Sequence, residues 1–159
     1  MRGLNMNNFQ IHTKALDERA LYNEFCGICK ELNYGAFLSF SGIIRAEGDI
    51  SGLSFDIYEP LLKKWFDSWC EKTKDLNVKL FFAHTKGDVL VGECSYFAGI
   101  ASSHRKNGLS IFAEFVEDFK QNAPIWKYDL INNERIYAKD RSFKLPNAGI
   151  LGISNRNYK

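Results

Sequence analysis

The sequence predicts a single α+β domain in which three main helices pack against a mostly antiparallel sheet. Apolar residues recur at helical spacing in three segments, at about residues 17–32, 60–74 and 104–121. The segments between them are rich in β-forming residues and come in pairs, whereas a doubly wound parallel sheet needs single strands that alternate with helices. The length of 159 residues, with 45% hydrophobic and 25% charged residues, is typical of one globular domain.

Residues 33–35 terminate the first predicted helix, with Gly35 suited to a C-cap, and two strands follow. These strands cover residues 36–45 and 53–58, and a polar loop joins them. The pattern predicts a hairpin or a neighbouring antiparallel pair. The apolar face of the helix would consist of Leu21, Phe25, Ile28 and Leu32.

Pro60 lies in the first turn of the second predicted helix, where the missing N–H of proline costs nothing. Two more strands follow at residues 78–84 and 89–101, and residues 86–88 would form the turn between them. The apolar stripe of this helix would consist of Leu61, Leu62, Trp65, Phe66 and Trp69.

Ser102 or Ser103 can cap the third predicted helix, and Pro124 enforces its end. Two last strands, at residues 125–128 and 135–138, flank an Asn–Asn turn. The buried face of the third helix would consist of Leu109, Phe112, Phe115, Val116 and Phe119.

Residues 1–141 form the predicted domain, because no linker, repeat or shift in composition interrupts them. The remaining residues, 142–159, are rich in Gly and Asn and would form a C-terminal tail to which the pattern assigns no helix or strand.

Composition and charge exclude several classes of protein. The net charge is +2, from 21 basic and 19 acidic residues, and this balance argues against a general nucleic-acid binder. The first residues lack the apolar run of an export signal, and no stretch approaches the ~18 apolar residues of a membrane span. We therefore expect a cytoplasmic protein whose four cysteines are reduced.

Two lysines flank a turn that proline enforces late in the sequence. Lys120 closes the third helix and Lys127 lies in the strand after Pro124, so both ammonium groups could face one pocket. Two close cations lower each other's pKa and burial lowers it further, which suits general acid–base or nucleophilic chemistry. The alternative is a pair of ordinary surface lysines, one of which complements the helix dipole.

A second cationic cluster, His104 and Arg105, lies in the first turn of the same helix. The helix dipole disfavours cations there, whereas an arginine beside free N–H groups suits a phosphate or a carboxylate. Arg45, at the end of a predicted strand, could reach over the rim of a pocket. The alternative is that both arginines face the solvent and that His104 packs or caps the helix.

Cys26 and Cys29 have the spacing of a redox or zinc motif. They fall inside an amphipathic helix, and no second Cys or His pair has metal-ligand spacing. We therefore predict no metal site and a structural role for both thiols, and a thiol oxidoreductase that uses this pair is an alternative function. His12 and His84 have no evident partner and are interpreted as structural or surface groups.

These clusters, in this order, resemble the molybdopterin synthase large-subunit family between about Asn33 and Arg141. Four stretches carry the resemblance, and their common order and spacing make it specific. They are residues 35–45 (GAFLSFSGIIR), 87–93 (GDVLVGE), 102–105 (SSHR) and 120–127 (KQNAPIWK).

The resemblance implies an α/β-hammerhead fold and a sulfurtransferase. The substrate would be cyclic pyranopterin monophosphate, which receives two sulfurs and becomes the dithiolene of molybdopterin. The donor would be the thiocarboxylated C-terminal glycine of a small ubiquitin-like sulfur-carrier subunit, whose tail enters a pocket on this chain. Family members form a homodimer with one small subunit at each end, which makes a heterotetramer, and the resemblance implies no cofactor.

By motif position, the family's two catalytic lysines fall on Lys120 and Lys127. A C-terminal pocket arginine of the family falls near Lys139 or Arg141, of which we take Arg141. The other substrate-pocket residues of the family fall on Arg45, His104 and Arg105.

The two cationic clusters lie at opposite ends of one predicted helix. His104 and Lys120 are sixteen residues apart, which is roughly 24 Å along a helix axis. A guest the size of a pterin phosphate cannot easily touch both ends. We therefore predict a composite pocket, with both lysines and Arg45 from one chain and His104 and Arg105 from its dimer mate. A non-catalytic module that binds a ubiquitin-like protein is the alternative function, but it would not explain two lysines at a rigid turn.

Overall fold

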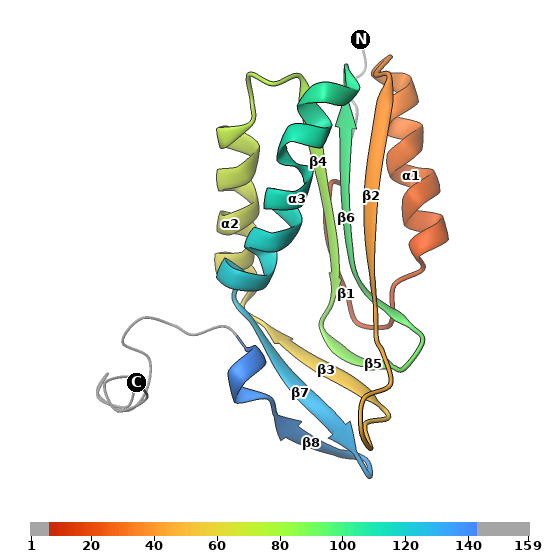
Figure 1. Ribbon diagram of the computed structural model, residues 1–159, viewed down its shortest axis with the longest axis vertical. Coiled ribbons are helices and arrows are strands. Elements are labelled where there is room, and N and C mark those ends of the chain that lie inside the picture. The colour runs from red at the N-terminus through yellow and green to blue at the C-terminus, as the bar shows by residue number, and fades with distance from the viewer. Residues whose placement is uncertain (1–6, 143–159) are drawn as a thin grey trace, which may run out of the picture.

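The computed structural model describes residues 7–142, which form two four-stranded sheets and three α-helices (Figure 1). One sheet has the strand order β1-β4-β6-β2 and the other the order β5-β3-β7-β8. In chain order the elements are β1 (Phe9–His12), α1 (Glu18–Glu31), β2 (Ala36–Ile43), β3 (Gly52–Ile57), α2 (Glu59–Lys72), β4 (Val78–Thr85), β5 (Gly87–Leu90), β6 (Cys94–Ser102), α3 (Arg105–Asn122), β7 (Ile125–Ile131), β8 (Glu134–Tyr137) and the short 3₁₀ helix η1 (Lys139–Arg141).

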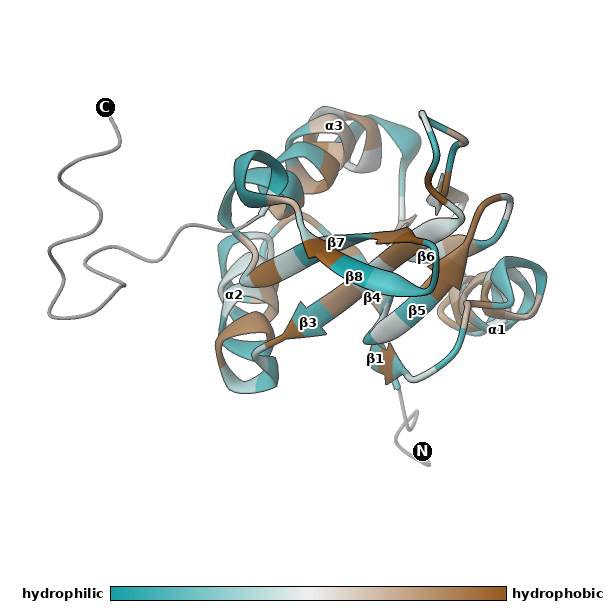
Figure 2. Cartoon of the chain, turned by 90° about the horizontal axis from the view of Figure 1, so that it is seen from below, coloured by the Kyte–Doolittle hydropathy of each residue, from teal (hydrophilic) through white to brown (hydrophobic). Residues whose placement is uncertain are grey.

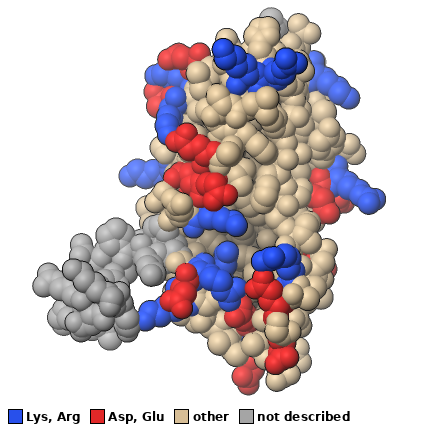
Figure 3. All heavy atoms as spheres, in the orientation of Figure 1, with Lys and Arg blue, Asp and Glu red and all other residues tan. Residues whose placement is uncertain are grey.

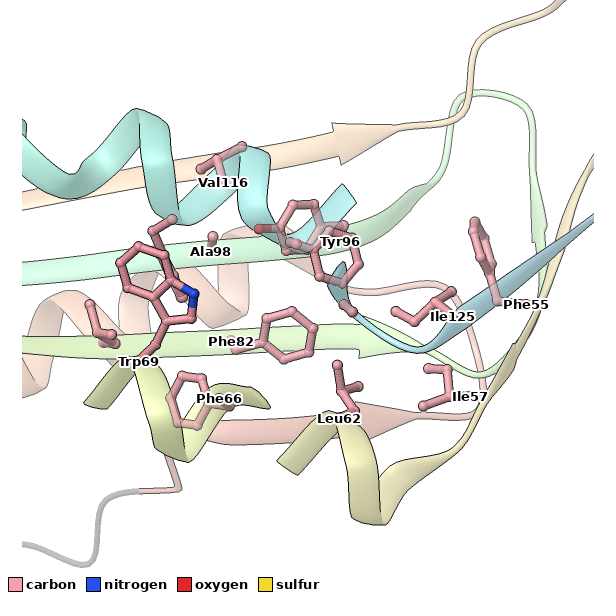
Figure 4. Packing of buried hydrophobic residues seen from close by; sticks show 14 of the residues in the cluster. Phe55, Ile57, Leu62, Phe66, Trp69, Phe82, Tyr96, Ala98, Val116 and Ile125 are labelled. Atoms are coloured by element: carbon pink, nitrogen blue, oxygen red, sulfur yellow. The ribbon is translucent and has the colours of Figure 1, made fainter. Parts of the chain in front are cut away.

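The first sheet forms the centre of the molecule because its middle strand is buried throughout. All residues of β6 are buried, and β6 pairs in antiparallel register with both β2 and β4. Successive side chains of a strand point to opposite faces, so β4 directs Phe82 towards α2 and α3 and Phe81 towards α1. Figure 4 shows Leu62, Phe66 and Trp69 of α2 packed around Phe82.

The three predicted helices form, with ends within two residues of the predicted ones. Asp17 caps α1, because its side chain accepts a hydrogen bond from the backbone N–H of Ala20 at 3.0 Å. Most of the predicted apolar faces are buried or partly buried, but Leu61 and Leu109 are 37% and 57% exposed. Their assignment to the buried faces was therefore wrong, because each helix contacts the sheet along a narrower stripe than the sequence suggested.

The predicted pairing of residues 36–45 with residues 53–58 is wrong. These segments form β2 and β3, which lie in different sheets. Strand β2 pairs along its whole length with β6, and the connecting loop carries the chain across to the second sheet, where β3 pairs with β5 and β7. The local sequence pattern predicted a hairpin of β2 and β3, but β2 pairs with β6 because this long buried strand offers a more extensive apolar partner.

The predicted long strand at residues 89–101 is also wrong, as is the turn at residues 86–88. A turn centred on Gly92, whose φ is +87°, divides the segment into β5 and β6. Glu93 closes this turn, because its carboxylate accepts from the backbone N–H of Leu90 at 2.8 Å. The run of apolar residues through the turn concealed the break.

The N-cap of α3 is His104, not Ser102 or Ser103, and its side chain makes no capping hydrogen bond. The hydroxyl of Ser102 nevertheless contributes to the first turn, because it accepts from the backbone N–H of Gly108 at 3.1 Å. Two elements, β1 and η1, were not predicted at all.

The second sheet lies across the lower end of the first (Figure 1), and Figure 2 shows it from below with the helices around it. Strand β7 continues from α3 after Pro124 and pairs with β3 and β8. The α+β class and the mostly antiparallel pairing are confirmed, although the strands form two sheets, and β1 runs parallel to β4.

The predicted tail, residues 142–159, lies outside the described residues except for Ser142. Among residues 7–142, no helix is long and apolar enough to cross a membrane.

Candidate functional site

A pocket of about 550 Å³, the junction pocket, opens where the two sheets meet. Its walls come from the end of β2 and the loop after it, from β3, from the end of α3 and from β7. Figure 3 shows lysine and arginine side chains gathered with acidic ones at this level of the molecule. Four of the six predicted site residues line the junction pocket, namely Arg45, Lys120, Lys127 and Arg141.

The two lysines converge as the turn at Pro124 predicted. Lys120 belongs to the last turn of α3 and Lys127 to β7, and both line the junction pocket. Lys127 is partly buried, and this burial, together with the nearby charges of Lys120 and Arg141, lowers the pKa of its amine. The pocket therefore holds one amine that gives up its proton more readily than a surface lysine does.

The backbone of Lys127 is held on both sides. Lys127 is the strand partner of Phe55 in β3. On the opposite edge of β7, the carbonyl oxygen of Lys127 accepts a hydrogen bond from the backbone N–H of Ala138 at 2.9 Å. Its own N–H donates to the hydroxyl of Ser142 at 2.7 Å. Ser142 was missed by the sequence analysis, since nothing in the pattern around it indicated a contact with β7.

Both arginines of the junction pocket are paired with carboxylates. Arg45 contacts Glu47 at 2.6 Å, with both side chains largely exposed, and Arg141 contacts Asp129 at 2.6 Å. The exposed pair of Arg45 and Glu47 contributes little stability, so an incoming anion can displace Glu47 at small cost. The sequence offered Lys139 or Arg141 as the C-terminal pocket residue, and Arg141 lines the junction pocket.

The floor of the junction pocket is aromatic. Tyr96 stacks on Phe119 with ring centroids 4.1 Å apart, and both line the pocket together with His84. Burial raises the pKa of Tyr96, whose hydroxyl oxygen is the single fully buried side-chain nitrogen or oxygen without a hydrogen-bond partner among residues 7–142. His84 was interpreted as a structural or surface residue; it is buried, and the sequence analysis missed its place in the pocket. Its position two residues after Phe82, on the same face of β4, was the available signal.

His104 and Arg105 lie elsewhere in the chain. Together with Gly35, Ser103 and Lys106 they line a separate open groove at the N-terminal end of α3. Figure 1 shows α3 running from this end down to the junction of the sheets. The structure of one chain thus divides the six predicted site residues into two groups at opposite ends of one helix.

The cysteines show no sign of a reactive site. Cys29 is buried on the inner face of α1, and burial raises its pKa. Burial also raises the pKa of Cys70 and of Cys94 to about 11. Within residues 7–142, no group of His, Cys, Asp and Glu side chains is arranged to hold a metal ion. These observations favour a structural role for the thiols over a thiol oxidoreductase.

Comparison with known proteins adds independent evidence. Residues 11–122 match a family described as MoaE protein. A relative from Helicobacter pylori described as "Molybdopterin synthase catalytic subunit" is 53% identical over 137 residues, which cover 86% of this chain and 94% of the relative. A relative of the same description from Arabidopsis thaliana is 32% identical over 115 residues, which cover 69% of this chain and 58% of the relative.

Solved structures agree with the sequence comparison. The chain is similar to one in a protein–protein complex of subunits 1 and 2 of molybdopterin-converting factor from Helicobacter pylori, with a TM-score of 0.84 and 52% identity over 90% of this chain and 98% of that chain. A molybdopterin synthase structure from Staphylococcus aureus shares the fold at 22% identity, with a TM-score of 0.66 over 83% of this chain and 97% of that chain.

Proposed function

The chain belongs to the MoaE protein family, and on that premise we infer that it acts as the catalytic subunit of a molybdopterin synthase, a sulfurtransferase that works with a small subunit. The observation that carries this function is the convergence of Lys120 and Lys127 in one pocket. We place the protein in the cytoplasm, where its thiols stay reduced. We also propose that the functional domain covers residues 1–141.

The substrate of the proposed reaction is cyclic pyranopterin monophosphate, and the sulfur donor is the thiocarboxylated C-terminal glycine of a ubiquitin-like carrier. The thiocarboxylate sulfur attacks a side-chain carbon of the pterin and displaces the oxygen bonded to that carbon, which leaves with the electron pair as a phosphate-ester oxygen or, once protonated, as water. The new C–S bond joins carrier and substrate as a thioester. Water then cleaves the acyl–sulfur bond, which releases the carrier as a carboxylate and leaves the sulfur on the pterin. Two such transfers give the dithiolene.

The lysines serve the hydrolytic half of this reaction. Lys127 has a lowered pKa, so it is suited to accepting and returning a proton as water attacks the acyl carbon. Lys120 lies in the same pocket, and its ammonium group would stabilise the oxyanion that develops on the acyl oxygen. The small subunit brings the nucleophilic sulfur, so this chain needs no catalytic cysteine or cofactor.

The arginines bind the anionic guest. Arg45 and Arg141 line the pocket and would exchange their carboxylate partners for the substrate phosphate. His104 and Arg105 cannot reach the same guest from the same chain, because the 18 residues of α3 span roughly 27 Å. We therefore propose that a dimer mate supplies these two residues, within a heterotetramer that carries one small subunit at each end.

Reconstitution tests the proposed function directly. The purified chain is incubated with thiocarboxylated carrier and cyclic pyranopterin monophosphate, and the dithiolene product is measured. The same carrier with an ordinary C-terminal carboxylate is the control, and it should give no product. Absence of dithiolene in the complete mixture, with a demonstrated complex between the two subunits, would leave only a binding module for the carrier.

A further inference from the structure

The floor of the junction pocket holds a chemical group that the proposed reaction leaves unused, the imidazole of His84. This side chain is 2% exposed and lines the pocket together with both lysines. Four aromatic rings surround it. Phe55 meets it edge-on with ring centroids 4.8 Å apart, and Phe119, Tyr96 and Phe82 lie at 5.3, 5.9 and 6.3 Å. Packing of this density holds the imidazole ring in one orientation.

One hydrogen bond fixes which ring nitrogen carries the proton. Nδ1 of His84 lies 2.8 Å from the backbone carbonyl oxygen of Thr85, and because a carbonyl oxygen can only accept, Nδ1 must donate. Burial lowers the pKa of His84 to about 4, with the hydrogen bond to Thr85 opposing this shift and the charge of Lys127 adding to it, so the ring carries a single proton at neutral pH. Nε2 therefore presents a lone pair and no hydrogen.

Nε2 remains available to a guest. Among residues 7–142, the ring of His84 has a hydrogen-bond partner at Nδ1 and none at Nε2. The only fully buried side-chain nitrogen or oxygen without a partner in these residues is Tyr96 Oη, so Nε2 is not fully buried. Nε2 thus keeps contact with the pocket that His84 lines. The charged side chains around the same pocket are four cations that donate hydrogen bonds in their protonated form, Arg45, Lys120, Lys127 and Arg141, and one acid, Glu47, which is already paired with Arg45.

We propose that His84 is a substrate-contacting residue whose Nε2 accepts a hydrogen bond from an O–H or N–H group of the guest in the junction pocket. The proposal rests on the proposed function, since it takes the guest to be the cyclic pterin. Such a guest has an anionic end, which the arginines bind, and hydroxyl or ring N–H groups, which need an acceptor. A fixed lone pair among donors selects a guest that has a hydrogen to give and rejects one that lacks it.

Two amide substitutions separate the roles of the two ring nitrogens. The amide N–H of His84→Asn lies near the position of Nδ1, so this variant keeps the hydrogen bond to Thr85 and loses Nε2. The amide oxygen of His84→Gln reaches the position of Nε2, so this variant keeps the acceptor and loses the bond to Thr85. Dithiolene formation by each assembled enzyme is measured as kcat and KM, with thermal unfolding as the check on the fold.

We expect His84→Asn to raise the KM for the cyclic pterin about tenfold, with a smaller change in kcat, and His84→Gln to keep a KM near that of the wild type. A purely structural role would give the reverse order, because only His84→Asn keeps the bond to Thr85. That reverse order, or an equal rise in KM for two folded variants, would overturn the proposal.

A second measurement serves if neither variant folds. The nitrogen-15 resonance of His84 Nε2 in the wild-type enzyme, assigned by elimination from His12 and His104, should move when the cyclic pterin saturates the site. A resonance that stays in place at saturation would overturn the proposal. Failure of the proposed function is a separate outcome, because it would appear as a wild-type enzyme that makes no dithiolene, and the resonance experiment needs no turnover.

Discussion

Cations lie at both ends of α3, but a partly buried one, Lys127 of β7, lies only at the C-terminal end. At the N-terminal end, His104 and Arg105 are exposed beside an open groove. At the C-terminal end, Lys127 lies partly buried over an aromatic floor, and its pKa is lowered. An exposed cation attracts anions through a charge that water and salt screen, whereas an enclosed amine can also exchange a proton. The comparison teaches that enclosure, more than residue type, decides which cations can perform chemistry.

The enclosure at the C-terminal end comes from the second sheet. Strand β7 continues from α3 after Pro124 and pairs with β3, so the chain covers its own helix end. At the other end of α3 the groove around Arg105 is open within the described part of the chain. Under the proposed function, a dimer mate uses that open end, and each chain contributes one half of two sites.

Removal of the enclosed amine should have the largest effect. We expect Lys127→Met to lower kcat for dithiolene formation by about 10²- to 10⁴-fold, because a positioned proton-transfer group is lost. The backbone hydrogen bonds of residue 127 to Ala138 and Ser142 do not involve its side chain and should persist. Rates are compared in single-turnover reactions with saturating carrier.

The same variant also tests the cause of the lowered pKa. Because the folded-state pKa of Lys127 lies below its usual value, the folded chain binds this proton more weakly than the unfolded chain does. The protonated amine therefore destabilises the fold at neutral pH, and this penalty shrinks as the pH rises above the folded pKa and is gone above the usual pKa of lysine. The Tm of Lys127→Met at pH 7 should exceed that of the wild type, and a clear fall in Tm would contradict the assigned burial.

Mixed dimers test whether the open end serves a neighbour. Lys120→Ala and Arg105→Ala should each abolish most turnover in their own homodimers. In a verified heterodimer of the two variants, one pocket carries both lesions and the other carries neither, so about half of the wild-type activity per dimer should return. Activity that stays at the level of the homodimers would contradict the proposal that the two residues of one site come from different chains. The singly mutated chains paired with wild type are the matched controls.

Loss of Arg141 should have a smaller effect, in two measurable parts. Arg141→Gln removes one charged phosphate contact, so the KM for the cyclic pterin should rise about tenfold.

The Arg141→Gln substitution also removes one of the cations that lower the pKa of Lys127. The acidic limb of the kcat profile, where protonation of Lys127 abolishes activity, should therefore move to higher pH. Lys139→Gln, beside it on η1, is the control, and an identical change in both variants would argue against a specific role for Arg141.

Much of the enclosed half-site could be predicted from the sequence, because its lysines are fixed by local features. The end of α3, the proline and the following strand lie within a few residues of one another, and such local geometry follows from backbone rules. The charge pattern also singled out Arg45, but it left surface side chains as the alternative for Arg45 and for both lysines, and the resemblance of four ordered stretches to a known family favoured the functional interpretation.

The sequence failed where tertiary pairing decides the outcome. The partners of β2 and β3 depend on β6, which lies far along the chain, and the local hairpin pattern gave the wrong pair. His84 looked unremarkable because its neighbours Phe55 and Phe119 come from distant elements. The only local signal for His84 was the strand alternation that places it on the same face of β4 as Phe82, and this alternation predicts burial but no role.

Removal of all four thiols should have the smallest effect on turnover. Neither end of α3 has a cysteine in its pocket, and the carrier brings the reacting sulfur in the proposed reaction. The variant replaces all four cysteines by Ala, namely Cys26, Cys29, Cys70 and Cys94. It should lose some thermal stability, because Cys29 and Cys94 are buried. Its kcat should stay within about twofold of the wild type. Turnover is measured below the Tm of the variant, with circular dichroism to confirm folding. A folded variant that binds the carrier but no longer transfers sulfur would assign a thiol to the reaction, and the two lysines would then lose their place as the residues on which catalysis depends.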